Sequence, residues 1–165
     1  MRTYNRHIIL SEIGQEGQDK ISNAKVLVIG AGGLGCPILQ YLTAAGVGTI
    51  GIIDFDVVEL SNLQRQVLFG ASSIGKNKAL AAKARLQDLN DAISFNAFPE
   101  PLTYQNALEI FQQYDIIVDG SDNVTTRFLI NDYAHRTQKT VISAAIQGFT
   151  GQLTTFKPHQ GKTHP

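Results

Sequence analysis

The stretch Val26-Leu27-Val28-Ile29-Gly30-Ala31-Gly32-Gly33-Leu34-Gly35 decides the fold of this chain. An apolar run that is typical of a buried strand breaks into a glycine loop, and a helical pattern follows. The glycine spacing Gly-x-Gly-x-x-Gly falls on Gly30, Gly32 and Gly35. Glycines permit a tight turn and a close approach to a phosphate, and the new helix directs its unpaired N–H groups at that anion. The stretch therefore predicts a nucleotide-binding half-domain, and a glycine turn without a ligand is the alternative.

The next strand pattern supports the nucleotide site. An apolar run over residues 49–53 ends at Asp54, which follows the glycine loop at a spacing of roughly 20 residues. A carboxylate at that place can accept hydrogen bonds from ribose hydroxyls. Strand, glycine loop, helix, second strand and acidic residue occur in the required order. This order favours a bound nucleotide over a bare turn, and it leaves NAD and ATP both open.

Composition narrows the class of protein. The chain has 165 residues, of which 43% are hydrophobic, and its formal net charge is zero. This length is enough for one domain with a core, and the balanced charge argues against nucleic-acid or membrane-surface binding. No apolar run is as long as a membrane span, and the polar start at residues 1–6 is no signal peptide. Cys36 is the single cysteine, so an internal disulfide is excluded and a cytoplasmic location is expected.

Strand and helix patterns alternate along the chain. This order predicts an α/β fold, a doubly wound and mainly parallel Rossmann-like sheet with helices on both faces. Thr103 is expected to be the N-cap of a short helix. The expected helices cover residues 33–45, 77–89, 103–111 and 124–136, and the expected strands cover 26–29, 49–53, 94–98, 116–119, 140–145 and 152–156.

Residues that could carry chemistry follow the strands. Ligands of such sheets bind at the carboxyl ends of the strands, where the glycine loop, Asp54 and the segments 119–123 and 144–148 would lie. If Arg65 and a lysine of the basic cluster Lys76-Asn77-Lys78 converge on the glycine loop, they would neutralise a triphosphate, and Asp122 could hold its magnesium. A dehydrogenase needs no such cations. The comparison favours ATP over NAD.

Most of these residues also have a purely structural interpretation. Arg65, Lys76 and Lys78 could be solvated surface charges, which is the usual state of Arg and Lys. Asp54 and Asp119 could cap the turns that end their strands. Cys36 is interpreted as a packing residue rather than a catalytic thiol. The four histidines are too scattered to predict a metal site, and no Cys-x-x-Cys pair offers a zinc site.

Several motifs together resemble the ThiF/MoeB/HesA family, the bacterial relatives of ubiquitin-activating enzymes. The resemblance covers residues 4–156, and its Asn-Leu-Gln-Arg-Gln and Asp-Asn motifs are far more specific than the glycines. It implies that ATP adenylates the C-terminal Gly-Gly carboxylate of a ubiquitin-like sulfur carrier (ThiS-like or MoaD-like) with release of pyrophosphate, in thiamine or molybdopterin biosynthesis. The motifs are Tyr4-Asn5-Arg6-His7-Ile8-Ile9-Leu10, Gly30-Ala31-Gly32-Gly33-Leu34-Gly35, Asp54-Phe55-Asp56, Ser61-Asn62-Leu63-Gln64-Arg65-Gln66, Gly75-Lys76-Asn77-Lys78 and Asp119-Gly120-Ser121-Asp122-Asn123.

The resemblance also implies residue roles. Asp54 would bind the ribose, and Asp122 would hold Mg²⁺. Arg6 is similar to the arginine that reaches the γ-phosphate from the partner subunit, which implies a homodimer. A general base is not required, because the nucleophile is already a carboxylate. The implied catalytic residues are Arg6, Arg65, Lys78 and Asp122, and the implied ATP-binding residues are Gly30, Gly32, Gly33, Gly35, Asp54, Ser61, Asn62, Leu63, Gln64, Arg65, Lys78, Asp122 and Asn123.

The end of the chain departs from the family pattern. Family members continue with two Cys-x-x-Cys pairs for structural zinc, which would begin just after His164 and Pro165. We therefore expect an N-terminal helical arm over residues 1–24, an ATP-binding Rossmann-like domain over 25–157, and a polar tail or truncation point over 158–165. Zinc is expected only if the native chain continues past Pro165. Two alternatives remain, an NAD-dependent oxidoreductase and a nucleotide-binding module that is catalytically incomplete; the sequence does not identify the carrier.

Overall fold

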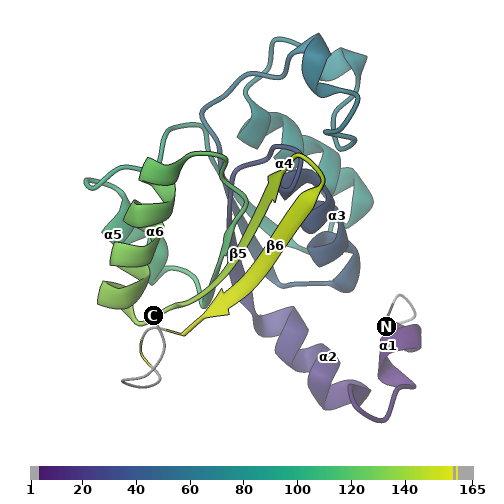
Figure 1. The fold of residues 1–165 in the computed structure, drawn as a ribbon. Coiled ribbons are helices and arrows are strands. Elements are labelled where there is room, and N and C mark those ends of the chain that lie inside the picture. The colour runs from purple at the N-terminus through teal and green to yellow at the C-terminus, as the bar shows by residue number, and fades with distance from the viewer. Residues whose placement is uncertain (1–3, 158, 160–165) are drawn as a thin grey trace.

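Five parallel strands and one antiparallel strand form the sheet in the computed structural model, which describes residues 4–157 and 159 (Figure 1). The strand order is β3-β2-β1-β4-β5-β6, in which β6 is antiparallel to β5. This arrangement confirms the predicted doubly wound, mainly parallel sheet. The strands are β1 (Lys25–Ile29), β2 (Thr49–Ile53), β3 (Ser94–Phe98), β4 (Ile116–Asp119), β5 (Thr140–Gln147) and β6 (Thr150–Phe156).

Helices cover both faces of the sheet. On one face lie α3 (Gly35–Ala45) and α4 (Lys78–Leu89), and on the other lie α5 (Ala107–Gln112) and α6 (Val124–Thr137) (Figure 1). Strand β1 is apolar from Val26 to Ile29 because its successive side chains point to opposite faces, both of which are covered by helices. Val26 and Val28 pack in the core beneath α3 and α4, whereas Leu27 and Ile29 pack beneath α5 and α6.

Two helices precede the sheet, α1 (Asn5–Ile8) and α2 (Gly14–Asn23). They are tied to the domain by polar contacts. The Tyr4 hydroxyl accepts a hydrogen bond of 2.7 Å from Asn90 Nδ2, and Gln18 Nε2 donates to the Ala45 carbonyl at 3.2 Å. The N-terminal segment is therefore helical, as predicted. That it forms an arm separate from the Rossmann-like domain stays a prediction. The predicted tail over 158–165 lies outside the described residues apart from His159.

Several predicted boundaries are wrong. Helix α5 begins at Ala107, not at Thr103, because the Thr103 N–H donates to Asn106 Oδ1 at 2.8 Å and forms a turn ahead of the helix. Thr103 is therefore no N-cap. Helix α3 begins at Gly35, two residues later than predicted, since the glycine loop continues through that stretch. Strands β5 and β6 are also longer than predicted and meet in a hairpin at Gly148, whose φ is +60°.

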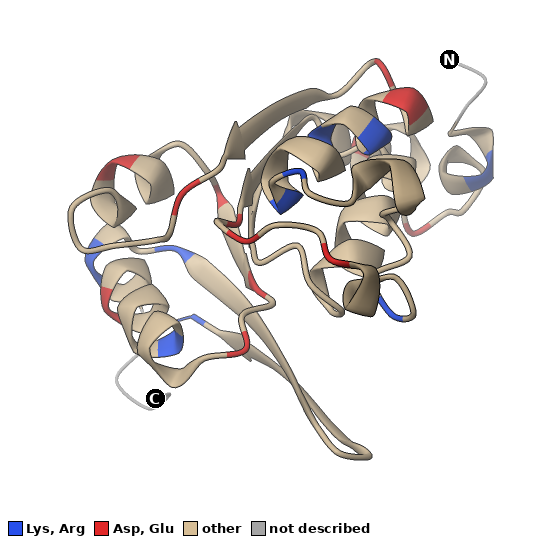
Figure 2. Cartoon of the chain, turned by 90° about the horizontal axis from the view of Figure 1, so that it is seen from above, with Lys and Arg blue, Asp and Glu red and all other residues tan. Residues whose placement is uncertain are grey.

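The strand order fixes where a ligand can bind. Strands β1 and β4 are neighbours, but the chain leaves β1 toward α3 on one face and leaves β4 toward α6 on the other. Such a topological switch opens a crevice at the carboxyl ends of the two strands. Figure 2 looks down on this edge, where several acidic positions lie in the loops that follow the strands.

Gly35 is expected to be intolerant of any side chain. A Cβ at this position would lie 1.9 Å from the Gly30 carbonyl oxygen, and backbone cannot move aside as a side chain can. We expect Gly35→Ala to lower the free energy of unfolding by about 3 kcal/mol, the upper range for overpacking. Gly70→Ala is the matched control, because a Cβ there meets no atom within 4 Å. Urea unfolding curves with equal midpoints for the two variants would contradict this prediction.

Candidate nucleotide-binding site

A cleft of about 1500 Å³ lies at the carboxyl ends of the strands. The glycine loop, the segment after β2, the N-terminus of α4, the loop after β4 and the hairpin between β5 and β6 form its walls. Among the predicted site residues, the following line this cleft: Gly30, Gly32, Gly33, Asp54, Asn62, Arg65, Lys78, Asp122 and Asn123. The fold thus gathers residues that are up to about ninety positions apart in the sequence.

The glycines of the loop fall into two groups. Gly30 has a φ of +91° and its ideal Cβ would lie 3.0 Å from the Gly120 carbonyl oxygen, and Gly35 packs on Gly30 itself. The protein's own packing therefore requires these two. Gly32 and Gly33 have only ordinary contacts at their ideal Cβ positions, the nearest atoms being at 3.8 and 3.6 Å. A bare turn would not need glycine at these two positions, so their openness fits a ligand that approaches the loop from the cleft.

Asp54 connects the glycine loop to the end of β2. Its Oδ2 accepts a hydrogen bond from the Ala31 N–H at 2.7 Å, and its Oδ1 accepts one from the Asp56 N–H at 2.8 Å. Burial raises the pKa of the carboxyl, and these two backbone N–H groups oppose that rise. The turn-capping interpretation is therefore confirmed. Because Asp54 also lines the cleft, ribose binding stays a prediction beside it.

Lys78 is not a solvated surface charge. Only 6% of the residue is exposed, and its Nζ forms an ion pair of 2.8 Å with Asp56 Oδ2. Asn77 holds this arrangement in place: its Oδ1 caps α4 by accepting from the Leu80 N–H, and its Nδ2 donates to the Asp54 carbonyl. The surface interpretation of Lys78 is wrong, and that of the exposed Lys76 is confirmed.

Arg65 and Gln66 follow the short helix η1 (Leu60–Asn62). The methylene groups of Arg65 lie over Gly33, and its Nη1 donates to the Ser61 carbonyl at 3.3 Å. The guanidinium therefore lies beside the glycine loop, as an arginine that converges on a phosphate must. Gln66 is only 3% exposed and lines the same cleft, and its buried Oε1 has no hydrogen-bond partner among the described residues.

The two aspartates after β4 have different environments. Asp119 is buried, and its oxygens accept hydrogen bonds from the Ser121 N–H, the Ser121 hydroxyl and the Ser143 hydroxyl. It is a turn-capping residue, as its structural interpretation predicts. Asp122 is exposed and lines the cleft, and Asn123 caps α6 by accepting from the Thr126 N–H at 2.8 Å. Asp122 is the free carboxylate of this loop.

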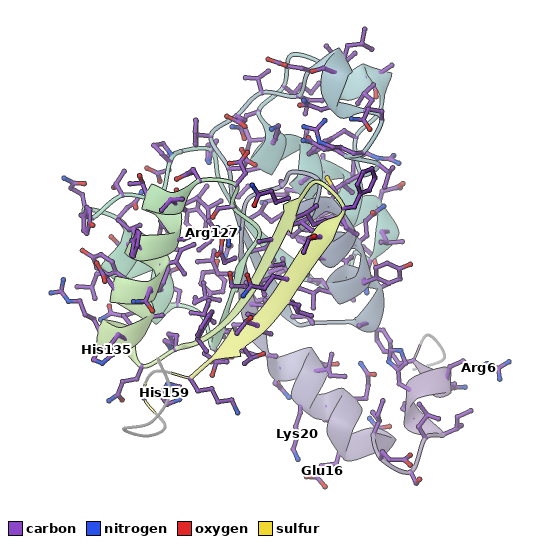
Figure 3. All side chains as sticks on the ribbon, in the orientation of Figure 1. Arg6, Glu16, Lys20, Arg127, His135 and His159 are labelled. Carbon is purple, nitrogen blue, oxygen red and sulfur yellow. The ribbon has the colours of Figure 1, made fainter. Side chains whose placement is uncertain are left out.

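Some predicted site residues do not line the cleft. Ser61 lies in η1 and Leu63 and Gln64 follow it, all three outside the cleft, and Gly35 is buried in the contact between strand and helix. Arg6 lies on α1 and points into solvent, far from the cleft (Figure 3). A role for these residues in binding stays a prediction, and for Arg6 it requires a second subunit.

Several polar side chains of the cleft are not among the predicted site residues, and Gln66 and Arg127 are two of them. Gln66 stands inside a quoted motif, so the motif itself offered a signal. No sequence motif pointed to Arg127, because its hydrogen bonds join the carbonyls of Ser121 and Ala144, which only the fold brings together.

Cys36 is a packing residue, as predicted. It is fully buried, and its Sγ–H donates to the Ala31 carbonyl at 3.3 Å. Burial raises the pKa of the thiol to about 11, so at neutral pH it holds its proton and is a poor nucleophile. In the part of the chain that the structure describes, no helix is both long and apolar enough to cross a membrane.

The comparison with known proteins adds to this geometry. A model of the ThiF family matches residues 4–164, nearly the whole chain. The chain belongs to the ThiF family. This confirms the family predicted from the motifs, in agreement with the observed strand order and glycine loop.

Curated relatives of this ThiF-family chain are longer than it is. A protein of Thermus thermophilus named sulfur carrier protein adenylyltransferase is 50% identical over 93% of this chain, which spans 56% of that relative. A Xenopus laevis protein named adenylyltransferase and sulfurtransferase MOCS3 is 49% identical over 96% of this chain, which spans 35% of it. The chain thus spans between about a third and just over half of these relatives.

Solved structures agree on the fold. The E. coli MccB structure with MccA-N7isoASN matches with a TM-score of 0.79 and 32% identity, covering 87% of this chain and 42% of that one. A structure of PaaA matches with the same TM-score of 0.79 and 27% identity, covering 87% and 44%.

Proposed function

We propose that this chain is an adenylyltransferase that activates the C-terminal Gly-Gly carboxylate of a ubiquitin-like sulfur carrier with ATP and Mg²⁺. The observation that carries the proposal is the joint lining of one cleft by two cations, Arg65 and Lys78, a free carboxylate, Asp122, and two open glycines. A relative at 50% identity bears the name sulfur carrier protein adenylyltransferase. The names of further relatives, MoeZ and MOCS3, fit a role in molybdopterin or thiamine biosynthesis.

The proposed reaction needs little acid–base chemistry. A carboxylate oxygen of the carrier forms a bond to the α-phosphorus of ATP, the bond from that phosphorus to the bridging oxygen breaks, and pyrophosphate leaves with both electrons. The carboxylate is already ionised, so no proton is removed. Charge grows on the pyrophosphate, where Arg65 and Lys78 are placed to stabilise it. Lys78 is preorganised for this task by its ion pair with Asp56.

The described residues fit Mg²⁺ held in part by the substrate. They include no group of three or more His, Cys, Asp or Glu side chains that could hold a metal by itself. A single carboxylate such as Asp122, together with phosphate oxygens and water, is the coordination that Mg²⁺ commonly adopts. When bound, the ion would neutralise phosphate charge.

Nucleotide titrations and an exchange assay test this proposal. ATP with Mg²⁺ and NAD are titrated separately by calorimetry, and ATP is expected to bind while NAD does not. Pyrophosphate exchange into ATP is then measured with and without a ThiS-like or MoaD-like carrier. Binding of NAD alone would favour an oxidoreductase. ATP binding without carrier-dependent exchange would favour a nucleotide-binding module that is catalytically incomplete.

Asp54 supplies a test of ribose binding. We expect Asp54→Asn to raise the ATP dissociation constant by roughly ten- to a hundredfold, since charge-assisted hydrogen bonds contribute about 1.5–3 kcal/mol. Asparagine keeps the size of the side chain, but its NH2 group cannot accept a hydrogen bond, so only one of the contacts from the Ala31 and Asp56 N–H groups is kept. Affinities for ATP and 2′,3′-dideoxy-ATP are measured in parallel. If the wild-type protein binds both equally well, Asp54 is a loop-holding residue and no more.

A further inference from the structure

Arg127 is a half-buried cation at the edge of the nucleotide cleft. Its Nη2 donates to the Ser121 carbonyl at 2.8 Å and to the Ala144 carbonyl at 3.0 Å, so the guanidinium joins the loop after β4 to strand β5. Its Nε and Nη1 have no hydrogen-bond partner among the described residues. Figure 3 shows Arg127 between α6 and β5, inside the molecule rather than on its rim.

No acidic side chain of the described residues forms an ion pair with Arg127. Asp119 lies on the same small cavity of about 340 Å³, but its oxygens already accept three hydrogen bonds from serines. A cation that is partly desolvated and lacks a counterion favours an anion from outside. Arg127 lines both this cavity and the nucleotide cleft, so such an anion would stand where the two meet.

Arg127 contacts other strand ends than the remaining cations of the cleft do. Lys78 pairs with Asp56 just after β2, and Arg65 lies over Gly33 just after β1. Arg127 binds the carbonyls of the loop after β4 and of β5, on the other side of the switch point. A displacement at phosphorus needs the nucleophile and the leaving group on opposite sides. Because cations lie on both sides of the glycine loop, one side can bind the anionic nucleophile and the other the anionic leaving group.

We propose that Arg127 binds the attacking carboxylate of the carrier through its free Nε and Nη1 groups. This inference rests on the proposed adenylation and names the residue that positions its nucleophile. Arg65 and Lys78 face the pyrophosphate, and Arg127 holds the carboxylate opposite them. The two carbonyls that accept from Nη2 fix the plane of the guanidinium, which leaves its other edge in a set orientation for a two-point contact with a carboxylate.

The test compares a carrier that ends in Gly-Gly carboxylate with the same carrier ending in a C-terminal amide. Binding of each is measured by calorimetry with a non-hydrolysable ATP analogue present, for the wild-type protein, Arg127→Gln, Arg127→Lys and the control Arg85→Gln. Arg85 is an exposed arginine of α4 and is absent from the cleft. We expect the wild-type protein and the control to prefer the carboxylate by roughly ten- to a hundredfold.

Arg127→Gln is expected to lose this preference while ATP still binds with unchanged affinity, and Arg127→Lys to keep part of it. Retained ATP affinity also shows that the variants are folded. If Arg127→Gln weakens ATP and both carriers alike and keeps the preference, the residue merely holds the loop and the inference is overturned. If the wild-type protein shows no carrier-dependent pyrophosphate exchange, the proposed function is overturned. The comparison of Arg127 variants tests only the role of Arg127.

Discussion

Replacing Asp122 with alanine is expected to abolish carrier-dependent pyrophosphate exchange, with a loss of at least about a hundredfold. Asp122 lies in the loop after β4 and is the free carboxylate of that loop in the cleft, because Asp119 is buried and already hydrogen-bonded. Without it, Mg²⁺ would lose a ligand and the triphosphate would keep charge that Arg65 and Lys78 alone have to balance. ATP affinity should therefore fall in the presence of Mg²⁺ and change little in EDTA.

A matched control is available on α6. Asp132→Ala removes an equal charge from an exposed position of α6, outside the cleft, and should leave exchange unchanged. Exchange rates of the wild-type protein and both variants are measured over a range of Mg²⁺ concentrations. Normal exchange by Asp122→Ala would show that the carboxylate does not serve the metal. An equal loss in both variants would indicate a general effect of charge.

The second large effect is expected from Arg6, acting across a homodimer interface. Arg6 is exposed on α1 and distant from the cleft of its own chain (Figure 3), so it can serve a nucleotide only in a partner subunit. The neighbouring Ile9 and Leu10 are 69% and 48% exposed, which leaves an apolar surface for such a contact. Arginines supplied in trans contribute up to several orders of magnitude in phosphoryl transfer, and attack at the α-phosphate makes a smaller loss reasonable for Arg6→Ala.

Subunit mixing distinguishes this arrangement from an action within one chain. Arg6→Ala and Lys78→Ala proteins, each inactive alone, are combined under conditions in which protomers exchange. A mixed dimer would hold one intact site and one site with both defects, so a random 1:1 mixture should recover about a quarter of the wild-type sites.

The control mixes Arg6→Ala with a protein that carries both substitutions, because no dimer of that mixture holds an intact site. Heterodimer formation is followed with differently tagged subunits. Recovery only in the first mixture would support Arg6 acting in trans. Heterodimers that form without any recovery would contradict it, and measurable activity of an isolated monomer would contradict the need for a partner.

The sequence predicted the central strands and helices well because their patterns are local. The apolar run before Gly30 is buried on both faces, and α4 starts at Lys78 with Asn77 as its cap, within one residue of the prediction. The prediction that Thr103 is an N-cap was wrong, because the hydrophobic pattern of the sequence does not show the turn that precedes the helix. The Asn106 side chain accepts from the Thr103 backbone and forms a turn of its own, which delays α5 to Ala107.

The site shows the same division between local and long-range information. The motif residues Asp54, Arg65 and Asp122 were placed correctly on the loops after their strands, and the fold brings them to one cleft. The sequence could not tell which member of an acidic pair is free. Asp119 ends β4, where it is buried and accepts hydrogen bonds from Ser121 and from Ser143 on the neighbouring strand, whereas Asp122 is exposed in the loop that follows.

What the sequence determined by itself was the α/β class, the glycine loop and the family, since each rests on residues that are close together in the chain. The tertiary structure decided the electrostatics of the site. Lys78 looks like a surface lysine in the sequence, but the fold buries it and pairs it with Asp56 across more than twenty positions. Arg127 has no sequence signal at all. Its position depends on two carbonyls, one in the loop after β4 and one in β5, and such contacts exist only once the sheet has formed.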